Sequence, residues 1–215
     1  MLKNHLLIFL RKSLRRKAFT AINFTGLSVS VAGALLIYLY VANELSFDRF
    51  HENGTRIYRM YAAYAHPGDA VSEFPDTPFN LGPTLAQNFD GIDAVTRVVD
   101  MSSSLMVRVG DSWFNETGIY EADSTFFKIF TGQFVAGTPA ALGRPHFVVI
   151  TTSTAERFFG GADEAMGKEL KVSLYGEGSY TVGGVVKDFP ANSHFRFSSL
   201  LSMDYAHEEL ERNIL

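Results

Sequence analysis

An uncharged run of 26 residues, from Ala18 to Asn43, constrains this chain more than any other feature. As an α-helix rising about 1.5 Å per residue, the run is roughly 39 Å long, whereas the hydrocarbon core of a bilayer is ~30 Å thick. A cleaved signal peptide has a shorter apolar core, and Tyr40 stands where cleavage after Ala42 would need a small residue. The run therefore predicts an uncleaved transmembrane helix over residues 18–43.

Charges are distributed unevenly on the two sides of this run. Residues 1–17 contain no acid and six cations, namely Lys3, Arg11, Lys12, Arg15, Arg16 and Lys17. Because cations collect on the cytoplasmic side of membrane proteins, we expect a cytoplasmic N-terminus, with residues 44–215 outside. The whole chain has a net charge of −4, so the part after residue 17 carries −10, which argues against nucleic acid as a partner. The chain has no cysteine, which excludes disulfides and thiol-based sites.

Residues 1–17 also have the pattern of an amphipathic helix. At about 100° per residue, and with Ile8 and Lys3 as exceptions, one side of this helix is apolar and consists of Leu2, Leu6, Leu7, Phe9, Leu10 and Leu14. The opposite side carries Arg11, Lys12, Arg15 and Arg16. The pattern predicts an interfacial helix along the cytoplasmic leaflet, with membrane lipid as its partner. A disordered basic tail is the alternative, because so short a helix is marginal in water.

Three small residues share one face of the expected membrane helix. Gly26, Ser30 and Gly33 follow one another at spacings of four and three, which brings them to the same side of a helix. Small residues let another membrane helix approach closely, so this face predicts a helix–helix contact. A chance recurrence of small residues is the alternative.

Beyond Asn43 the sequence predicts an α+β head. Alternation, aromatic residues and β-branched residues indicate strands at 56–66, 94–101, 104–110, 146–151, 168–175 and 179–186. Apolar residues every four positions indicate a helix at 79–89, interrupted early by Gly82 and Pro83. We expect Asp123 to cap a second helix, and Ser153 to open a third that ends at Gly160. The last two strands are expected to form a hairpin.

The search for chemistry gives no candidate catalytic, cofactor-binding or metal site. The segment at 161–168, GADEAMGK, resembles a phosphate loop but has five residues between its glycines and lacks the final Ser or Thr. The six histidines contain no H-x-x-x-H pair. Asp188, Ser193 and His194 lie close in sequence, yet no nucleophile elbow surrounds the serine. On an extended strand, Ser193 and His194 would point to opposite faces and not share a proton.

Five segments carry a family resemblance. They are ELSFDRFHENGTRIYRM after the uncharged run, EADSTFFKIFTGQFVAGTPAAL at 121–142, VVITTSTAERFFGG, MGKEL, and YTVGGVVKDFPANSHFRFSSLLS at 180–202. In this order they resemble the N-terminal part of MacB/FtsX-type ABC transporter permeases, over nearly the whole chain. The sequence departs from that family at Ala165, where proline is common, and at Gly183, where threonine is usual.

The resemblance implies a division of the chain into five parts. These are an interfacial helix at 1–17, a transmembrane helix at 18–43, a linker at 44–55, a MacB-like periplasmic core domain at 56–203, and a tail at 204–215. In such permeases the head is a porter-like β-α-β unit with an inserted lobe. Here the porter would begin at 56–101, the lobe would occupy 102–178, and the porter would resume at Tyr180.

The resemblance also implies partners and a mechanism. A separate cytoplasmic ABC ATPase binds ATP and drives such permeases, so no cofactor is expected in this chain. Further transmembrane helices or a second permease copy complete the membrane part, and closure of the dimer moves the head in the periplasm as an efflux or mechanotransmission stroke. No apolar run follows Met203, so we expect a truncated permease of the inner membrane that cannot transport alone. Apolar surface at Phe195, Phe197 and Leu200 should then be exposed.

Two other classes of function remain open. A single span followed by an acidic external domain is also sufficient for a membrane-tethered binding or sensor module. Three more spans and an ATPase encoded beside this chain would distinguish a permease from such a module. An anchored external enzyme is the third class, and loss of a hydrolase activity on changing Ser193 or His194 would support it.

Overall fold

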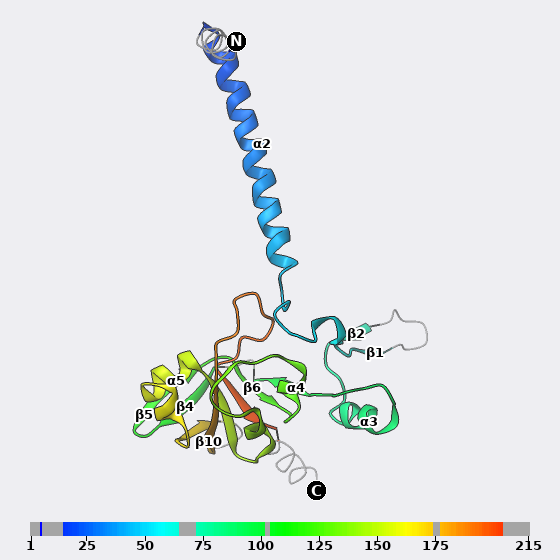
Figure 1. Ribbon diagram of the computed structural model, residues 1–215, viewed down its shortest axis with the longest axis vertical. Helices are drawn as coiled ribbons and strands as arrows, with labels where there is room; N and C mark the ends of the chain where they lie inside the picture. The colour runs from blue at the N-terminus through cyan, green and yellow to red at the C-terminus, as the bar shows by residue number, and fades with distance from the viewer. Residues whose placement is uncertain (1–4, 6–14, 65–71, 102–103, 174–176, 204–215) are drawn as a thin grey trace. The chain divides into compact units, whose positions relative to one another are not determined.

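The structure is a computed structural model, and it describes residues 5, 15–64, 72–101, 104–173 and 177–203 (Figure 1). The chain divides into two compact units, Met1–Phe47 and Asp48–Leu215. The first unit contains the long helix α2, and the second forms the head. Apart from residues 5 and 15–17, the expected interfacial helix lies outside the described residues, as does the expected tail at 204–215.

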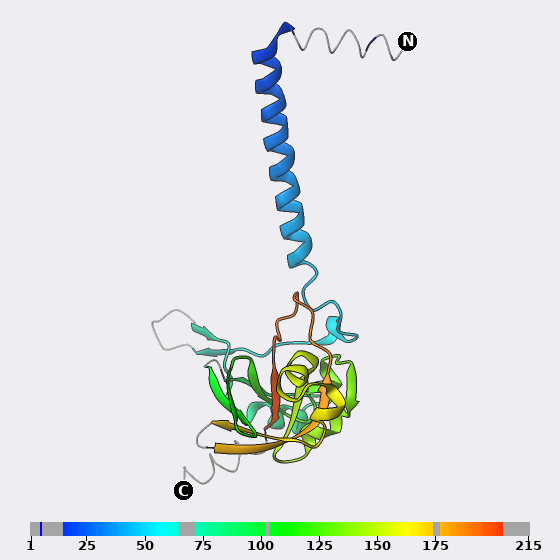
Figure 2. The same cartoon turned by 90° about the vertical axis from the view of Figure 1, so that its left-hand side faces the viewer.

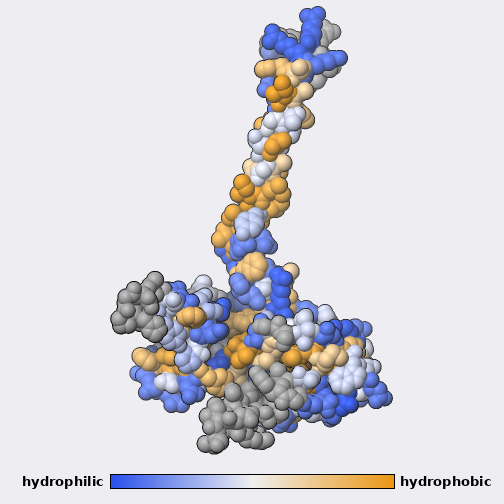
Figure 3. All heavy atoms as spheres, turned by 180° about the vertical axis from the view of Figure 1, so that it is seen from behind, coloured by the Kyte–Doolittle hydropathy of each residue, from blue (hydrophilic) through white to orange (hydrophobic). Residues whose placement is uncertain are grey.

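Helix α2 (Lys17–Glu44) is a single continuous helix of 28 residues (Figure 2). It extends one residue beyond the uncharged run at each end, and none of its residues is buried in the structure. Apolar side chains lie along it, while hydrophilic residues gather at its two ends (Figure 3). By length and composition this is the one helix among the described residues that is able to cross a membrane, which confirms the predicted long apolar helix.

The described residues of the head form two sheets. The small sheet pairs β1 (Ala62–Tyr64) with β2 (Ser72–Phe74). The large sheet contains the nine other strands, β3 (Val98–Asp100), β4 (Leu105–Val109), β5 (Ser112–Glu116), β6 (Ile119–Ala122), β7 (Phe134–Gly137), β8 (Phe147–Thr151), β9 (Glu169–Ser173), β10 (Glu177–Val186) and β11 (Ser199–Ser202). The helices of the head are η1 (Gly54–Arg56), α3 (Leu81–Asn88), α4 (Phe126–Ile129), η2 (Pro139–Gly143), α5 (Thr152–Phe159) and α6 (Ala162–Ala165). This mixture confirms the predicted α+β class.

The large sheet interleaves segments that are far apart in sequence. Its strand order is β3-β6-β11-β8-β10-β9-β4-β5, and β7 pairs with the end of β10. Strand β11 is parallel to β6, and β10 is parallel to β8, while the other pairs are antiparallel. Strands of the expected inserted lobe at 102–178 and strands of the returning segment after Tyr180 therefore belong to one sheet.

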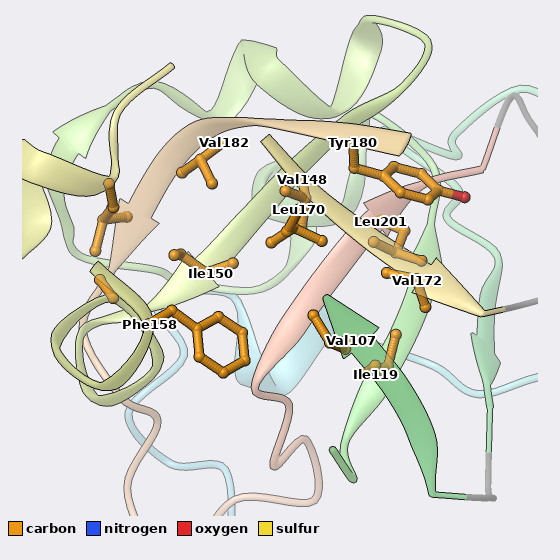
Figure 4. Packing of buried hydrophobic residues seen from close by; sticks show 13 residues of the cluster. Val107, Ile119, Val148, Ile150, Phe158, Leu170, Val172, Tyr180, Val182 and Leu201 are labelled. Atoms are coloured by element: carbon orange, nitrogen blue, oxygen red, sulfur yellow. The ribbon is translucent and has the colours of Figure 1, made fainter. Parts of the chain in front are cut away.

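Side chains on both faces of this sheet are buried. In β8, Val148 and Ile150 contribute to one hydrophobic cluster, while Val149 between them contributes to the other. Successive side chains of a strand point to opposite faces, so the two clusters lie on opposite sides. Figure 4 shows the first cluster, in which Phe158 of α5 packs towards the strand residues. A strand covered on both faces explains why β8 is apolar almost throughout.

The predicted helix starts are partly wrong. Helix α5 ends at Gly160 in the left-handed conformation, as expected, but its N-cap is Thr151, whose hydroxyl accepts from the N–H of Thr154. Ser153 lies inside the helix instead. Asp123 does not cap α4, because its carboxylate accepts three hydrogen bonds from Arg97. A bidentate arginine is a stronger partner for a carboxylate than one backbone amide.

The elements before residue 98 are shorter or more regular than predicted. Within the described part of the aromatic stretch, residues 56–64, only β1 is a strand, and it lies in a different sheet from β3. Helix α3 is continuous from Leu81, with Gly82 and Pro83 in its first turn, where proline is tolerated. The hairpin of β9 and β10 is confirmed by their antiparallel pairing, although residues 174–176 of its turn lie outside the described residues.

The expected exposure of apolar residues near the end of the described chain is wrong. Leu200 is fully buried and Phe197 is 6% exposed, while Phe195 is partly buried in the same cluster. The reason is that β11 lies inside the sheet, between β6 and β8, where both faces of the sheet are covered by packed side chains. The aromatic rings of α4 cover this face of the sheet, as the contacts of Phe126 with Phe195 and Phe197 show.

Candidate functional site

The head begins at Asp48, which contacts a loop from the other end of the chain. This loop, residues 187–198, joins β10 to β11 and is called the β10–β11 loop below. The backbone N–H of Asp48 donates to the carbonyl of Asn192 at 3.0 Å. Asp48 has a φ of 54°, in the left-handed region that aspartate adopts more readily than most residues. The main chain entering the head is therefore paired with the β10–β11 loop from its first residue.

The carboxylate of Asp48 accepts hydrogen bonds from two neighbouring residues of this loop. Its Oδ1 accepts from the hydroxyl of Ser193 at 3.0 Å and from the backbone N–H of His194 at 3.1 Å. Its Oδ2 bonds to Nδ1 of His194. Burial by itself raises the pKa of Asp48, but the hydrogen bonds and charge of His194, together with Ser193, lower it below its ordinary value of 3.8. The carboxylate is therefore charged at neutral pH, and both of its oxygens are hydrogen-bonded to the loop.

His51 forms a second attachment one turn later. Its ring is 5% exposed and lies among three phenylalanine rings, with centroid distances of 4.0 Å to Phe50, 5.2 Å to Phe130 and 5.9 Å to Phe189. Its Nδ1 accepts from the N–H of Thr131 at 3.0 Å, and its Nε2 lies 3.8 Å from Oδ1 of Asp48. Burial lowers the pKa of His51, and the opposing effect of Asp48 is smaller. His51 is thus a neutral anchor at pH 7.

The beginning of the β10–β11 loop is held by Asp188. Its carboxylate accepts from the N–H of Ser153 at 3.1 Å and from the hydroxyl of Thr152, both in the first turn of α5. Burial raises the pKa of Asp188, but these hydrogen bonds lower it below 3.8. A charged carboxylate near a helix N-terminus is favourable. The loop is therefore fixed at its start to α5 and at its middle to Asp48.

The structure separates the three residues that the sequence brings close. Ser193 and His194 both bind Asp48, whereas Asp188 binds α5. The hydroxyl of Ser193 donates to Asp48 and accepts from the N–H of Phe195 at 3.2 Å, so its proton is directed at a carboxylate and not at a histidine. This arrangement binds two segments together and does not activate a nucleophile.

Sequence reasoning missed Asp48 and His51. Their only local signal is that they are polar residues beside Phe47 and Phe50, in the segment SFDRFH that begins two residues after the uncharged run. We call Asp48, His51, Ser193 and His194 the junction cluster.

The comparison with known families decides what kind of head this is. The model of the MacB-like periplasmic core domain matches residues 20–214. The chain belongs to this family. The match includes most of α2 and the whole described head, so the junction cluster lies inside the MacB-like region.

Two solved structures are similar to this MacB-like chain. A domain of a protein designated a permease, from Porphyromonas gingivalis, has a TM-score of 0.53 and 21% identity, with 62% of this chain and 60% of that domain covered. The periplasmic region of MacB from Actinobacillus actinomycetemcomitans has 21% identity and a TM-score of 0.41, with 62% and 70% covered. The first likeness supports the fold, and the chain spans less than two thirds of that domain. Comparison with curated proteins gives no match.

Other candidates in the MacB-like head do not form a site. Residues 161–168 lie between α5 and β9 and contain α6, whose Ala165 is fully buried in the first cluster. Among the described residues, no three His, Asp or Glu side chains gather as metal ligands would. His66 and His207 lie outside the described residues. The junction cluster is therefore the candidate functional site of the described head.

Proposed function

We propose that this chain is the membrane anchor and external head of an ATP-driven permease of the MacB/FtsX type. The observation that carries the proposal is the family match over residues 20–214, which extends from the membrane helix into the head. The role is mechanical: movement of helices in the membrane is passed to the head, which acts on substrates outside the cell membrane in efflux or a related process. In this role the chain itself catalyses no reaction.

The proposed location is the bacterial inner membrane, with the N-terminus in the cytoplasm and residues 44–215 in the periplasm. The cations Arg15, Arg16 and Lys17 are at the start of α2, and Glu44 is at its end. This asymmetry of charge favours the orientation.

The proposed partners are lipid, other permease helices or a second permease copy, and a cytoplasmic ABC ATPase. ATP would be bound by that ATPase, with no cofactor in this chain. The small residues on one face of α2 support a helix partner, because they let another membrane helix approach closely. This face is open in the structure, since a Cβ at Gly26 or Gly33 would meet no atom within 4 Å. The hydroxyl of Ser30 donates to the carbonyl of Gly26 at 2.8 Å. The hydroxyl therefore has its hydrogen-bond acceptor within α2 and does not need one from a neighbouring helix.

The experiment is isolation of the tagged full chain from its native cells in mild detergent. We expect two kinds of partner to co-purify with the chain. One is an ATPase with a G-x-x-x-x-G-K-[ST] phosphate loop, and the other is a protein or segment with further transmembrane helices. The double variant Gly26→Leu/Gly33→Leu should reduce recovery of these partners, because bulky residues keep helices apart. Ala21→Leu/Ala32→Leu is the matched control, since these alanines lie on the opposite side of the helix.

A different outcome would reject the permease. If the chain is isolated without an ATPase, and both leucine pairs leave its partners unchanged, the tethered binding or sensor module is the better assignment. Retention of the partners in the control variant but not in the Gly26→Leu/Gly33→Leu variant would locate the contact on the small-residue face.

A further inference from the structure

The junction cluster connects the chain that leaves the membrane helix to the centre of the large sheet. The geometry points to Asp48 as the positioning residue that transmits displacement of the helix to β10 and β11. This inference rests on the proposed mechanical function and names the part that would perform it.

The first step of the argument is covalent order. Asp48 is the first residue of the head unit, and only three residues separate it from Glu44, the last residue of α2. Any axial movement of that helix must pass through this short connection. A force on the connection therefore acts first on the bonds of Asp48.

The second step is what those bonds hold. Asp48 contacts the β10–β11 loop through its N–H and through both carboxylate oxygens, over a sequence separation of 145 residues to Ser193. The loop leads directly into β11, which is hydrogen-bonded to β6 on one side and β8 on the other. Displacement of Asp48 is thus applied to an inner strand of the sheet and not to an edge.

The third step concerns the rigidity of the receiving part. At its other end, the β10–β11 loop is tied to α5 by Asp188. Within the loop, Arg196 donates to the carbonyl of Ala191 at 2.5 Å, and Phe189 packs against Phe197 with 5.0 Å between ring centroids. A loop braced in this way moves with the sheet, which is the physical requirement for passing on a displacement.

The fourth step separates this role from that of an ordinary turn residue. Turn formation needs only the positive φ of Asp48, which glycine supplies equally well. The side-chain contacts to Ser193 and His194 need the carboxylate. Replacement of Asp48 by glycine therefore preserves the turn and the backbone hydrogen bond to Asn192, and removes the side-chain contacts to Ser193 and His194.

The test is single-molecule force spectroscopy on the full chain in detergent micelles. The natural sequence has no cysteine, so Asn43→Cys gives a unique handle at the end of α2, and a peptide tag gives the second handle at the C-terminus. The first extension step should be release of residues 48–54, which frees at least ~20 Å of chain at roughly 3.3 Å per residue. Unfolding of the sheet should follow at higher force.

We expect Asp48→Gly to raise the rate of this first release about 10- to 100-fold at a given force, because several charge-assisted hydrogen bonds are lost together. The unfolding force of the sheet should stay unchanged. Asp48→Asn should restore part of the resistance, since an amide oxygen still accepts hydrogen bonds. Glu52→Gly is the matched control, an equal truncation of an exposed acid in the same segment, and should behave like the wild type.

Two results would overturn the inference. One is first release in Asp48→Gly at the wild-type rate. The other is a weakened sheet in Asp48→Gly with no separate change in the first step, which would make Asp48 a stabilising residue only. The force measurement contains no ATPase, so the absence of an ATPase partner would reject the permease without altering these steps.

Discussion

Replacing Phe126 with alanine should lower the free energy of unfolding of the head by about 3 to 5 kcal/mol, the range for large aromatic residues in a packed core. Phe126 is 0% exposed, and its ring centroid lies 4.8 Å from that of Phe130 and 5.4 Å from that of Phe195. The substitution leaves a cavity between α4 and the sheet. The rings of Phe130 and Phe195 cannot move far enough to fill it, because their backbone positions are fixed.

Urea unfolding of the full chain measures this loss. The sequence has one tryptophan, Trp113 in β5, so its fluorescence reports on the head without a contribution from the membrane helix. Phe89→Ala is the matched control, because this ring is 61% exposed and its loss should change the free energy by less than about 0.5 kcal/mol. Equal effects of the two substitutions would contradict the assignment of Phe126 to the core.

Glu121 should make the head less stable as the pH rises. Glu121 is 1% exposed in β6, and its Oε1 has no hydrogen-bond partner among the described residues. Burial raises the pKa of Glu121 from 4.5 to about 7. Between these values the folded state holds a proton that the unfolded state has lost, so the free energy of unfolding falls as the pH increases. The fall amounts to about 3 kcal/mol by pH 7 and is absent below pH 4.5.

Glu121→Gln should remove this dependence, since an amide has no charge to bury. The measurement is the difference in free energy of unfolding between wild type and variant from pH 4 to pH 8. Taking this difference cancels the opposite contribution of His51, whose lowered pKa favours the folded state as the pH rises. Glu156→Gln, on the exposed side of α5, is the matched control substitution. A flat difference for Glu121→Gln would contradict the burial of an uncompensated carboxylate.

Local sequence patterns predicted the elements that depend on local physics. The uncharged run gave α2 to within one residue at each end, and the glycine after Phe159 marked the end of α5. The apolar segment at 146–151 and the hairpin of β9 and β10 were also predicted correctly. In each case the signal lies within a few consecutive residues, where periodicity and turn chemistry act.

Contacts between distant segments could not be predicted in the same way. Asp48 and His194 are 146 residues apart, and nothing in the sequence around either residue indicates that the other is its partner. The position of β11 inside the sheet is also a tertiary feature, and for that reason the expected exposure of Phe197 and Leu200 was wrong. Asp123 is a further example. Its position before α4 is suitable for a capping residue, but its carboxylate binds Arg97, which belongs to another segment.

The most direct test of the account is the side of the membrane on which the head lies, since a head in the cytoplasm could not act as a periplasmic permease domain. The cysteine-free chain allows two single-cysteine variants, His5→Cys before the span and Ser112→Cys on the exposed part of β5. In intact cells treated with a membrane-impermeant maleimide, with the outer membrane made permeable, Ser112→Cys should be labelled. His5→Cys should react only after lysis and, as expected of an uncleaved span, should remain on the full-length chain. Labelling of His5→Cys in intact cells with protection of Ser112→Cys would contradict the account.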